Sequence, residues 1–174
     1  MLMTRVWPSS STTLPLRPRP KSAPKLLALD VGLDLHGMGL QGASSRAIPL
    51  ERLMDGRLAE LFVGQQLLAG SYPPVESLYF WVRETARSDA EVDFLLPGPV
   101  APVPLEVKSG TPGTLKSLHQ FLWRSGLKTG LRLWPHPKAD QRLEVAFPDG
   151  PLCCRLISLP IYLAEEIWSL LPSL

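Results

Sequence analysis

The chain has 174 residues, of which 45% are hydrophobic and 20% are charged. This length and composition are sufficient for one buried core and predict a single folded domain. The formal net charge of +2 is too small to indicate a partner, so any electrostatic argument has to come from local clusters of charge.

Residues 1–24 combine prolines with serines, threonines and a few basic residues. The prolines are Pro8, Pro15, Pro18, Pro20 and Pro24. This composition packs poorly and resists regular structure, so we predict a disordered tail without a function of its own. A flexible leader or the remnant of a longer protein explains it better than a nucleic-acid-binding arm, because its charges are few. The folded domain is expected over residues 25–174.

Two elements are predicted at the start of that domain. The apolar run over residues 25–33 is typical of a buried strand or of the start of a helix. Residues 50–69 predict a helix that ends at Gly70, and this helix is apolar on nearly all sides, which predicts burial. Within it, Glu60 lies in line with Val63 and Leu67 rather than on a solvated stripe.

The remaining pattern predicts a mixed fold. Strands over residues 78–83, 90–96 and 103–108 are separated by turn residues, which predicts an antiparallel meander. We therefore expect an α/β or α+β fold, with a central mixed sheet flanked by the Glu60 helix on one side and by the Lys116 helix on the other. The later predicted elements are a helix over 114–124, strands over 127–134, 142–147 and 152–159, and a last helix over 160–171.

Strand alternation separates apolar from charged side chains in the second and third strands of the meander. The side chains predicted to form apolar stripes are Val92, Phe94, Leu96, Leu105 and Val107. The opposite set is Asp93, Glu106 and Lys108, so two carboxylates and an ammonium group can share one face.

A carboxylate on a buried helix needs a cation, because an unpaired buried charge costs several kcal/mol. We therefore expect Glu60 to approach the face that bears Asp93 and Glu106, with Mg²⁺ or Mn²⁺ shared among the three acids. Asp93 and Glu106 are the predicted ligands, Glu60 an outer or second-metal ligand, and the carbonyl of Val107 a further one. Lys108 would position a water and stabilise negative charge, which together suits hydrolysis of a nucleic-acid phosphodiester.

A structural explanation of the same residues stays open. The Glu-Val-Lys sequence over residues 106–108 also suits an exposed edge strand, and Glu60 can pair with Arg57 or Lys108. Spacing alone favours this explanation, because each short pattern is common.

Several segments in order resemble the DUF4143 family. They are residues 25–33 (KLLALDVGL), 59–65 (AELFVGQ), 78–84 (LYFWVRE), 90–94 (AEVDF), 104–110 (PLEVKSG) and 158–163 (SLPIYL). The resemblance runs from about residue 25 to the end. It implies a PD-(D/E)XK restriction-endonuclease-like domain, usually attached behind an AAA-type ATPase domain, with Glu60, Asp93, Glu106 and Lys108 at the catalytic positions.

The resemblance has two departures. Leu61 stands where relatives usually carry Gln or Asn, and the ATPase half is absent. Residues 110–117 superficially resemble a phosphate loop, but Leu115 replaces the glycine needed before Lys116, so we predict no ATPase activity in this chain. The chain is expected to be the C-terminal part of an ATPase-linked protein, either truncated or with its ATPase encoded separately as a partner.

Two function classes follow from this resemblance. The first is a metal-dependent nuclease acting on DNA, and the second is a non-catalytic DNA-binding or protein-interaction module that retains the fold. A local excess of basic residues between positions 108 and 142, seven against the single acid Asp140, suits either a track for a phosphate backbone or a solvated surface.

Other residues are predicted to be structural. Trp81, Trp123, Trp134 and Trp168 are expected in the core, and the histidines lack metal-ligand spacing. The adjacent Cys153 and Cys154 point to opposite faces of a strand, which excludes a disulfide framework and favours a reducing compartment. No apolar run approaches the ~20 residues that span a bilayer, so a cytoplasmic protein without membrane contact is predicted.

Overall fold

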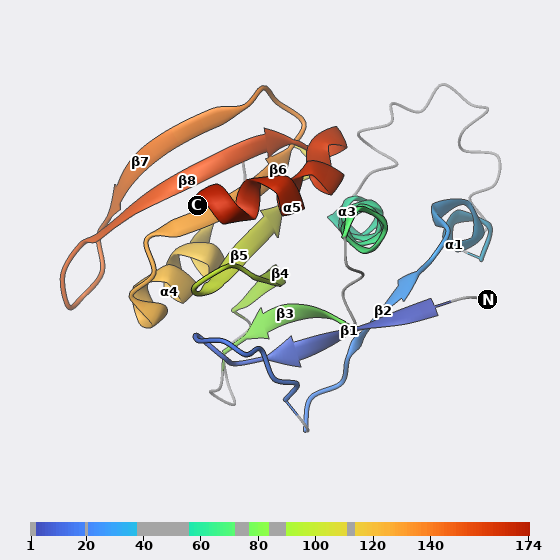
Figure 1. The fold of residues 1–174 in the computed structure, drawn as a ribbon, viewed down its shortest axis with the longest axis horizontal. Coiled ribbons are helices and arrows are strands. Elements are labelled where there is room, and N and C mark those ends of the chain that lie inside the picture. The colour runs from blue at the N-terminus through green and yellow to red at the C-terminus, as the bar shows by residue number, and fades with distance from the viewer. Residues whose placement is uncertain (1–2, 20, 38–55, 72–76, 84–89, 111–113) are drawn as a thin grey trace.

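A computed structural model describes residues 3–19, 21–37, 56–71, 77–83, 90–110 and 114–174. Within these ranges an eight-stranded mixed sheet runs in the order β2-β1-β3-β4-β5-β6-β8-β7 (Figure 1). The strands are β1 (Met3–Ser9), β2 (Lys25–Ala28), β3 (Leu78–Val82), β4 (Glu91–Pro97), β5 (Pro102–Val107), β6 (Thr129–Trp134), β7 (Ala139–Val145) and β8 (Leu152–Pro160). The mixed sheet flanked by helices is the predicted architecture, and it is confirmed.

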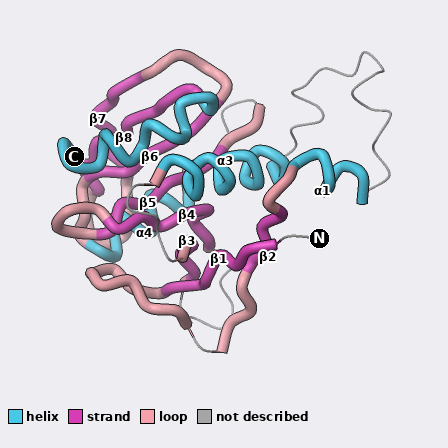
Figure 2. The backbone as a smooth tube through the Cα atoms, turned by 45° about the vertical axis from the view of Figure 1, so that its right-hand side comes forward, coloured by secondary structure: helices cyan, strands magenta, loops and turns pink. Residues whose placement is uncertain are grey.

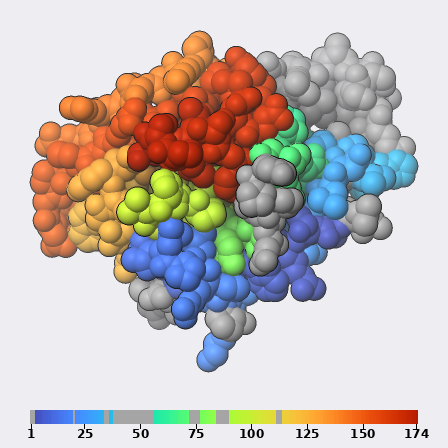
Figure 3. All heavy atoms as spheres, viewed as in Figure 1, coloured from blue at the N-terminus to red at the C-terminus, as the bar shows by residue number. Residues whose placement is uncertain are grey.

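Helices cover both faces of the sheet. They are α1 (Val31–Gly37), α3 (Gly56–Gly70), α4 (Lys116–Ser125), the 3-10 helix η1 (Ile161–Glu166), α5 (Ile167–Leu170) and the 3-10 helix η2 (Leu171–Ser173). The helix α3 and the C-terminal helices lie on one side, and α4 lies on the other (Figure 2). The C-terminal helices and strands β7 and β8 form a continuous part of the visible surface (Figure 3).

The core is correspondingly divided into two clusters. Residues such as Val63 and Leu67 of α3 pack with Leu105 of β5 on the first face. On the second face Leu118 and Phe121 of α4 pack against the sheet. Alternating residues of one strand feed the two clusters, as a sheet covered on both sides requires.

The predicted meander is confirmed, because β3 pairs antiparallel with β4 and β4 with β5. The next pair, β5 with β6, is parallel, and so is β6 with β8. The carboxyl ends of β5, β6 and β8 therefore meet at one edge of the sheet, and this edge carries Lys108. The run over residues 25–33 was predicted to be either a strand or the start of a helix. It forms both, because it contains β2 and the start of α1.

The expectation of a disordered tail over residues 1–24 is wrong for residues 3–9. These residues form β1, which lies between β2 and β3 and pairs with both. Pro8 is tolerated because β2 pairs only with residues 3–6 of β1, so the missing N–H of Pro8 leaves no gap in that ladder. Val6 is buried in the first core cluster, which gives this proline-rich segment its packing energy.

Three further expectations need correction or limits. The last helix is not continuous, because Pro160 still belongs to β8 and non-helical angles at Leu163 interrupt the turns that follow. Trp134 lies outside both core clusters and is partly exposed, whereas Trp81 is buried. The start of the predicted helix over residues 50–69 lies outside the described residues up to position 55.

The adjacent cysteines behave as predicted, since Cys153 is exposed and Cys154 is buried, and both are free thiols. Among the residues that the structure describes, no helix is long and apolar enough to cross a membrane.

Candidate functional site

Asp93 lies at the point where β4 separates from β5. The ladder between these strands joins residues 94–97 to residues 102–105 and stops there. Beyond it, Asp93 Oδ2 accepts a hydrogen bond from the backbone N–H of Val107 at 2.7 Å. The carboxylate thus replaces a strand partner for β5, which places it between the two strands.

A register shift explains this position. Tyr79 of β3 pairs with Leu95 of β4, yet Trp81 pairs with Val92, so β4 advances three residues while β3 advances two. The extra residue forms a bulge, which redirects side chains locally. As a result Val92 packs in the cluster beneath α4 while Phe94 packs in the cluster beneath α3. The predicted single apolar stripe over residues 92–96 is therefore wrong, because strict alternation fails at the bulge.

Glu106 and Lys108 lie together at the end of β5, as their spacing predicts. Lys108 Nζ donates to Glu106 Oε1 at 2.7 Å. Glu106 is only 6% exposed, and its buried Oε2 has no hydrogen-bond partner among the residues that the structure describes. A buried carboxylate oxygen without a donor is costly, so the site lacks one positive or donor group.

Glu60 meets a cation, as its burial requires, but that cation is Lys25. The Lys25 ammonium lies 2.5 Å from Glu60 Oε1 and 2.5 Å from Glu91 Oε1. It also lies 4.7 Å from the ring centre of Phe80. The pairing of Glu60 with Lys25 differs from the two partners, Arg57 and Lys108, that the sequence suggests.

The three predicted acids are all harder to ionise than usual. Burial, followed by the charge of Glu106, raises the pKa of Asp93 to about 6, against the opposing effect of the Val107 N–H. Burial also raises the pKa of Glu106, opposed by Lys108, and the pKa of Glu60, opposed by Lys25. A cation that binds next to such carboxylates stabilises their ionised forms.

The same effects show which side chains share a neighbourhood. The charge of Asp93 raises the pKa of Glu60, and the charge of Glu60 raises the pKa of Glu106. Burial lowers the pKa of Lys25, but Glu60 and Glu91 together raise it by more than burial lowers it. The pKa of Lys25 is therefore above its ordinary value. The structure therefore brings the predicted residues into one electrostatic cluster and adds Lys25 to it.

The donor set can be tested against a metal ion. Within the described part of the chain, no group of three or more carboxylate, imidazole or thiol side chains is positioned to hold a metal. The available set is two carboxylates, Asp93 and Glu106, with Glu60 held by Lys25. This set fits Mg²⁺, which usually binds through one or two carboxylates and keeps several waters. The unpartnered oxygen of Glu106 supports that fit.

Sequence reasoning missed Lys25 as part of this cluster. Lys25 precedes the apolar residues of β2, and a basic residue at the end of a strand is common and does not indicate a functional site. Its approach to Glu60 depends on β2 joining the sheet through β1, and β1 was not predicted.

Comparison with protein-family models finds a match over the middle of the chain. A family described as "Domain of unknown function (DUF4143)" matches residues 55–146, just over half of the chain. The chain belongs to the DUF4143 family. The matched span of this DUF4143 chain contains Glu60, Asp93, Glu106 and Lys108, whereas Lys25 precedes it. No curated protein and no solved structure matches the chain.

Proposed function

We propose that this DUF4143 chain is a nuclease-like domain of the PD-(D/E)XK type, a metal-dependent hydrolase acting on DNA phosphodiesters. The observation that carries the proposal is the buried Oε2 of Glu106, which has no hydrogen-bond partner within the described part of the chain. Its neighbour Asp93 is a second desolvated carboxylate, with a pKa of about 6. A divalent cation beside both groups would compensate both charges.

Each residue has a role that follows from its contacts. Asp93, Glu106 and the carbonyl of Val107 would hold Mg²⁺ or Mn²⁺, which when bound polarises a phosphoryl oxygen and lowers the pKa of a water. The Lys108 ammonium, fixed 2.7 Å from Glu106 Oε1, is suited to stabilise negative charge that develops on the phosphate. Glu60 orients Lys25 and adds negative charge to the cation site.

The strand arrangement supports the restriction-endonuclease-like fold within this proposal. The acids lie on the meander β3-β4-β5, and the parallel strand β6 follows a helix that covers one face. From the family resemblance we also infer an AAA-type ATPase partner, in the same longer protein or encoded separately, in the cytoplasm.

A second function is favoured by Lys25. Its ammonium is already paired with both Glu60 and Glu91, which leaves two carboxylates for a metal instead of three. A non-catalytic DNA-binding or protein-interaction module would keep this ion-pair cluster for stability alone.

Isothermal titration of Mg²⁺ and Mn²⁺ separates the two functions. We expect the wild type and the exposed-site control Asp149→Ala to bind a metal ion, and Asp93→Ala to lose this binding. Metal-dependent nicking of a plasmid or of a branched duplex by the first two proteins alone would support the hydrolase. Salt-sensitive DNA binding without cleavage would instead support the module, and equal metal affinity in all three proteins would rule out the site.

A further inference from the structure

A row of buried polar side chains crosses three strands next to the candidate site. Glu106 of β5 pairs in register with Arg132 of β6, and Arg132 pairs with Ser158 of β8. Their exposed fractions are 6%, 7% and 0%. Their neighbours along the strands, such as Leu131 and Leu133, belong to the core beneath α3. The row therefore faces the α4 side of the sheet.

Arg132 is a buried cation without a paired anion. Its Nε donates to Ser158 Oγ at 3.0 Å, and its guanidinium carbon lies 3.7 Å from the ring centre of Trp134. Within the described residues no carboxylate forms an ion pair with it, since Glu106 bonds to Lys108 instead. Burying an uncompensated charge is unfavourable, so this arrangement suits a ligand that supplies the anion.

The guanidinium is accessible to such a ligand. Among the described residues, Nε makes the one hydrogen bond of Arg132, and the two terminal nitrogens are not among the buried atoms that lack a partner. These nitrogens therefore reach solvent. A guanidinium with both terminal nitrogens free is the group best suited to bind a phosphate in a bidentate manner.

An aromatic pocket adjoins Arg132. Trp134 lines a pocket of about 590 Å³ together with His136, Lys138 and Tyr162. The indole is held in place, because Trp134 Nε1 donates to the carbonyl of Pro137 at 3.1 Å and the His136 ring meets it edge-on at 4.8 Å. Tyr162 is 71% exposed, so its ring is open to a ligand that enters this pocket.

This pocket lies at the same sheet edge as the candidate catalytic lysine. The backbone N–H of Lys108 donates to the carbonyl of Leu133 at 2.8 Å, and Leu133 stands between Arg132 and Trp134 in β6. Neighbouring strands are only ~4.8 Å apart. A nucleic-acid strand that passes Lys108 therefore meets Arg132 and Trp134 next.

We propose that Arg132, Trp134 and Tyr162 form a subsite for an unpaired nucleotide of a DNA strand that leaves the cleavage site. The guanidinium binds a phosphate, and the aromatic pocket takes a base, with Lys138 as an outer cation. Base stacking on aromatic side chains combined with cationic phosphate contacts is the usual basis of single-strand binding. The proposal rests on the proposed function for its choice of a nucleic acid as ligand.

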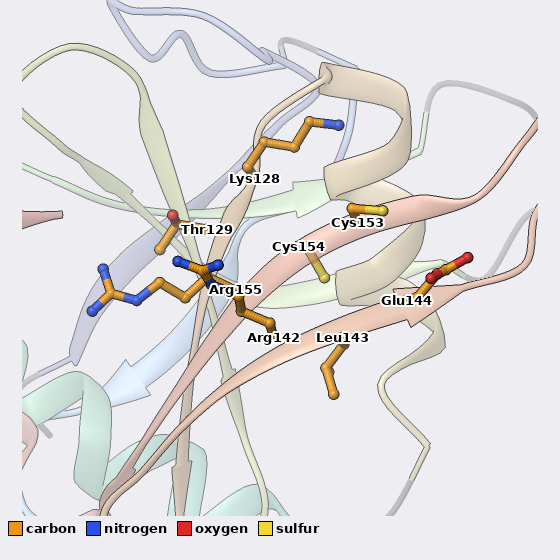
Figure 4. A pocket seen from close by; sticks show the side chains of 8 residues that line it. All are labelled: Lys128, Thr129, Arg142, Leu143, Glu144, Cys153, Cys154 and Arg155. Atoms are coloured by element: carbon orange, nitrogen blue, oxygen red, sulfur yellow. The ribbon is translucent and has the colours of Figure 1, made fainter.

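A second basic cluster does not offer the same chemistry and serves as a control. Arg142 and Arg155 lie beside one another in a pocket near the beginning of β6 and β8 (Figure 4). The Arg155 guanidinium already donates to both carboxylate oxygens of Asp140, with Nε 3.0 Å from Oδ1 and Nη2 2.7 Å from Oδ2. None of the described residues that line that pocket is aromatic.

The test measures binding of a labelled, 5′-phosphorylated ten-residue oligothymidylate in EDTA by fluorescence anisotropy. We expect Arg132→Met and Trp134→Leu to weaken binding about tenfold, and Tyr162→Ser to weaken it about threefold. Trp134→Phe keeps an aromatic ring and is expected to retain most of the affinity. Arg155→Met removes the same formal charge and should change the affinity less than twofold.

Thermal unfolding excludes a purely structural role. Replacing an unpaired buried charge by an apolar side chain of similar length is often neutral or stabilising, so Arg132→Met should not lower Tm. If Arg132→Met or Trp134→Leu does not fold, the exposed-site variant Tyr162→Ser decides the question. Equal losses in Arg132→Met and Arg155→Met, or unchanged affinity in Tyr162→Ser, would overturn the subsite.

Plasmid nicking with Mn²⁺ distinguishes failure of the subsite from failure of the proposed function. A wild type that nicks the plasmid but does not bind the oligothymidylate refutes the subsite alone. If the wild type binds the oligothymidylate through Arg132 but does not nick the plasmid, the subsite is supported and the proposed hydrolase function is refuted. A wild type that does neither refutes both.

Discussion

The two buried carboxylates at the end of the meander, Asp93 and Glu106, destabilise the folded protein when they are ionised. Asp93 and Glu106 are buried close enough for the charge of Glu106 to raise the pKa of Asp93. Their compensating contacts are one backbone N–H for Asp93 and one ammonium for Glu106. Unfavourable charge in the folded protein is characteristic of sites that await a ligand, since structural positions are seldom left in this state.

The variant Asp93→Asn should make the apo protein more stable at high pH. The folded pKa is about 6 and the ordinary value is 3.8, so the folded chain binds more protons between these values and loses stability as the pH rises. The loss amounts to about 3 kcal/mol at pH 8, and about 2 kcal/mol of it arises above pH 4.5. Asparagine keeps an acceptor for the Val107 N–H without the charge.

Urea unfolding at pH 4.5 and pH 8 in EDTA measures this effect. The stabilisation by Asp93→Asn should be larger at pH 8, while the exposed-site control Asp149→Asn should show no such pH dependence. An Asp93→Asn variant that is less stable than the wild type at pH 8 would contradict the conclusion that the ionised, desolvated carboxylate of Asp93 destabilises the fold.

At the scale of elements, α3 is packed closely against two distant segments. A Cβ on Gly64 would lie 2.7 Å from Leu27 Cδ1 of β2. A Cβ on Gly70 would lie 2.9 Å from the backbone oxygen of Glu165 in η1. The helix that carries Glu60 is thus fixed at its middle by the strand that carries Lys25 and at its end by the C-terminal turns. These contacts hold the Glu60–Lys25 ion pair in place.

Two substitutions within α3 should have opposite effects on stability. Gly70→Ala forces the backbone of η1 to move, so the free energy of unfolding should fall by about 1–3 kcal/mol. Gly56→Ala meets nothing within 4 Å among the described residues and should raise it by up to about 0.5 kcal/mol, because Gly56 is the first residue of α3 and alanine has the better helix propensity. Denaturant midpoints of both variants measure the difference, and a Gly70→Ala protein as stable as Gly56→Ala would show that η1 does not pack tightly on α3.

For the whole molecule, the N-terminal segment is part of the sheet. The strand β1 joins β2 to β3, and β2 carries Lys25, so the cluster around Glu60 depends on residues that precede the family match. The buried side chain of Val6 anchors β1 in the first core cluster.

A matched pair of substitutions in β1 tests this dependence. Val6 is 1% exposed and Met3 is 45% exposed. Val6→Asp should lower the free energy of unfolding by about 3 kcal/mol or more, because it buries an unpaired charge, whereas Met3→Asp should change it by less than about 0.5 kcal/mol. Thermal unfolding with limited proteolysis is the measurement. Equal stability of the two variants would mean that the segment is a dispensable tail.

The sequence by itself determined the order of the elements from β3 onward and the common face of Glu106 and Lys108. Both follow from local periodicity, since residues two apart on a strand share a face wherever the strand lies. It also indicated that Glu60 needs a cation. Only the tertiary structure decided that this cation is Lys25, that Asp93 fills the gap between β4 and β5, and that Arg132 lies beside Glu106. Those contacts depend on a bulge, on β1 pairing and on strand register, which are long-range pairings that no local pattern encodes.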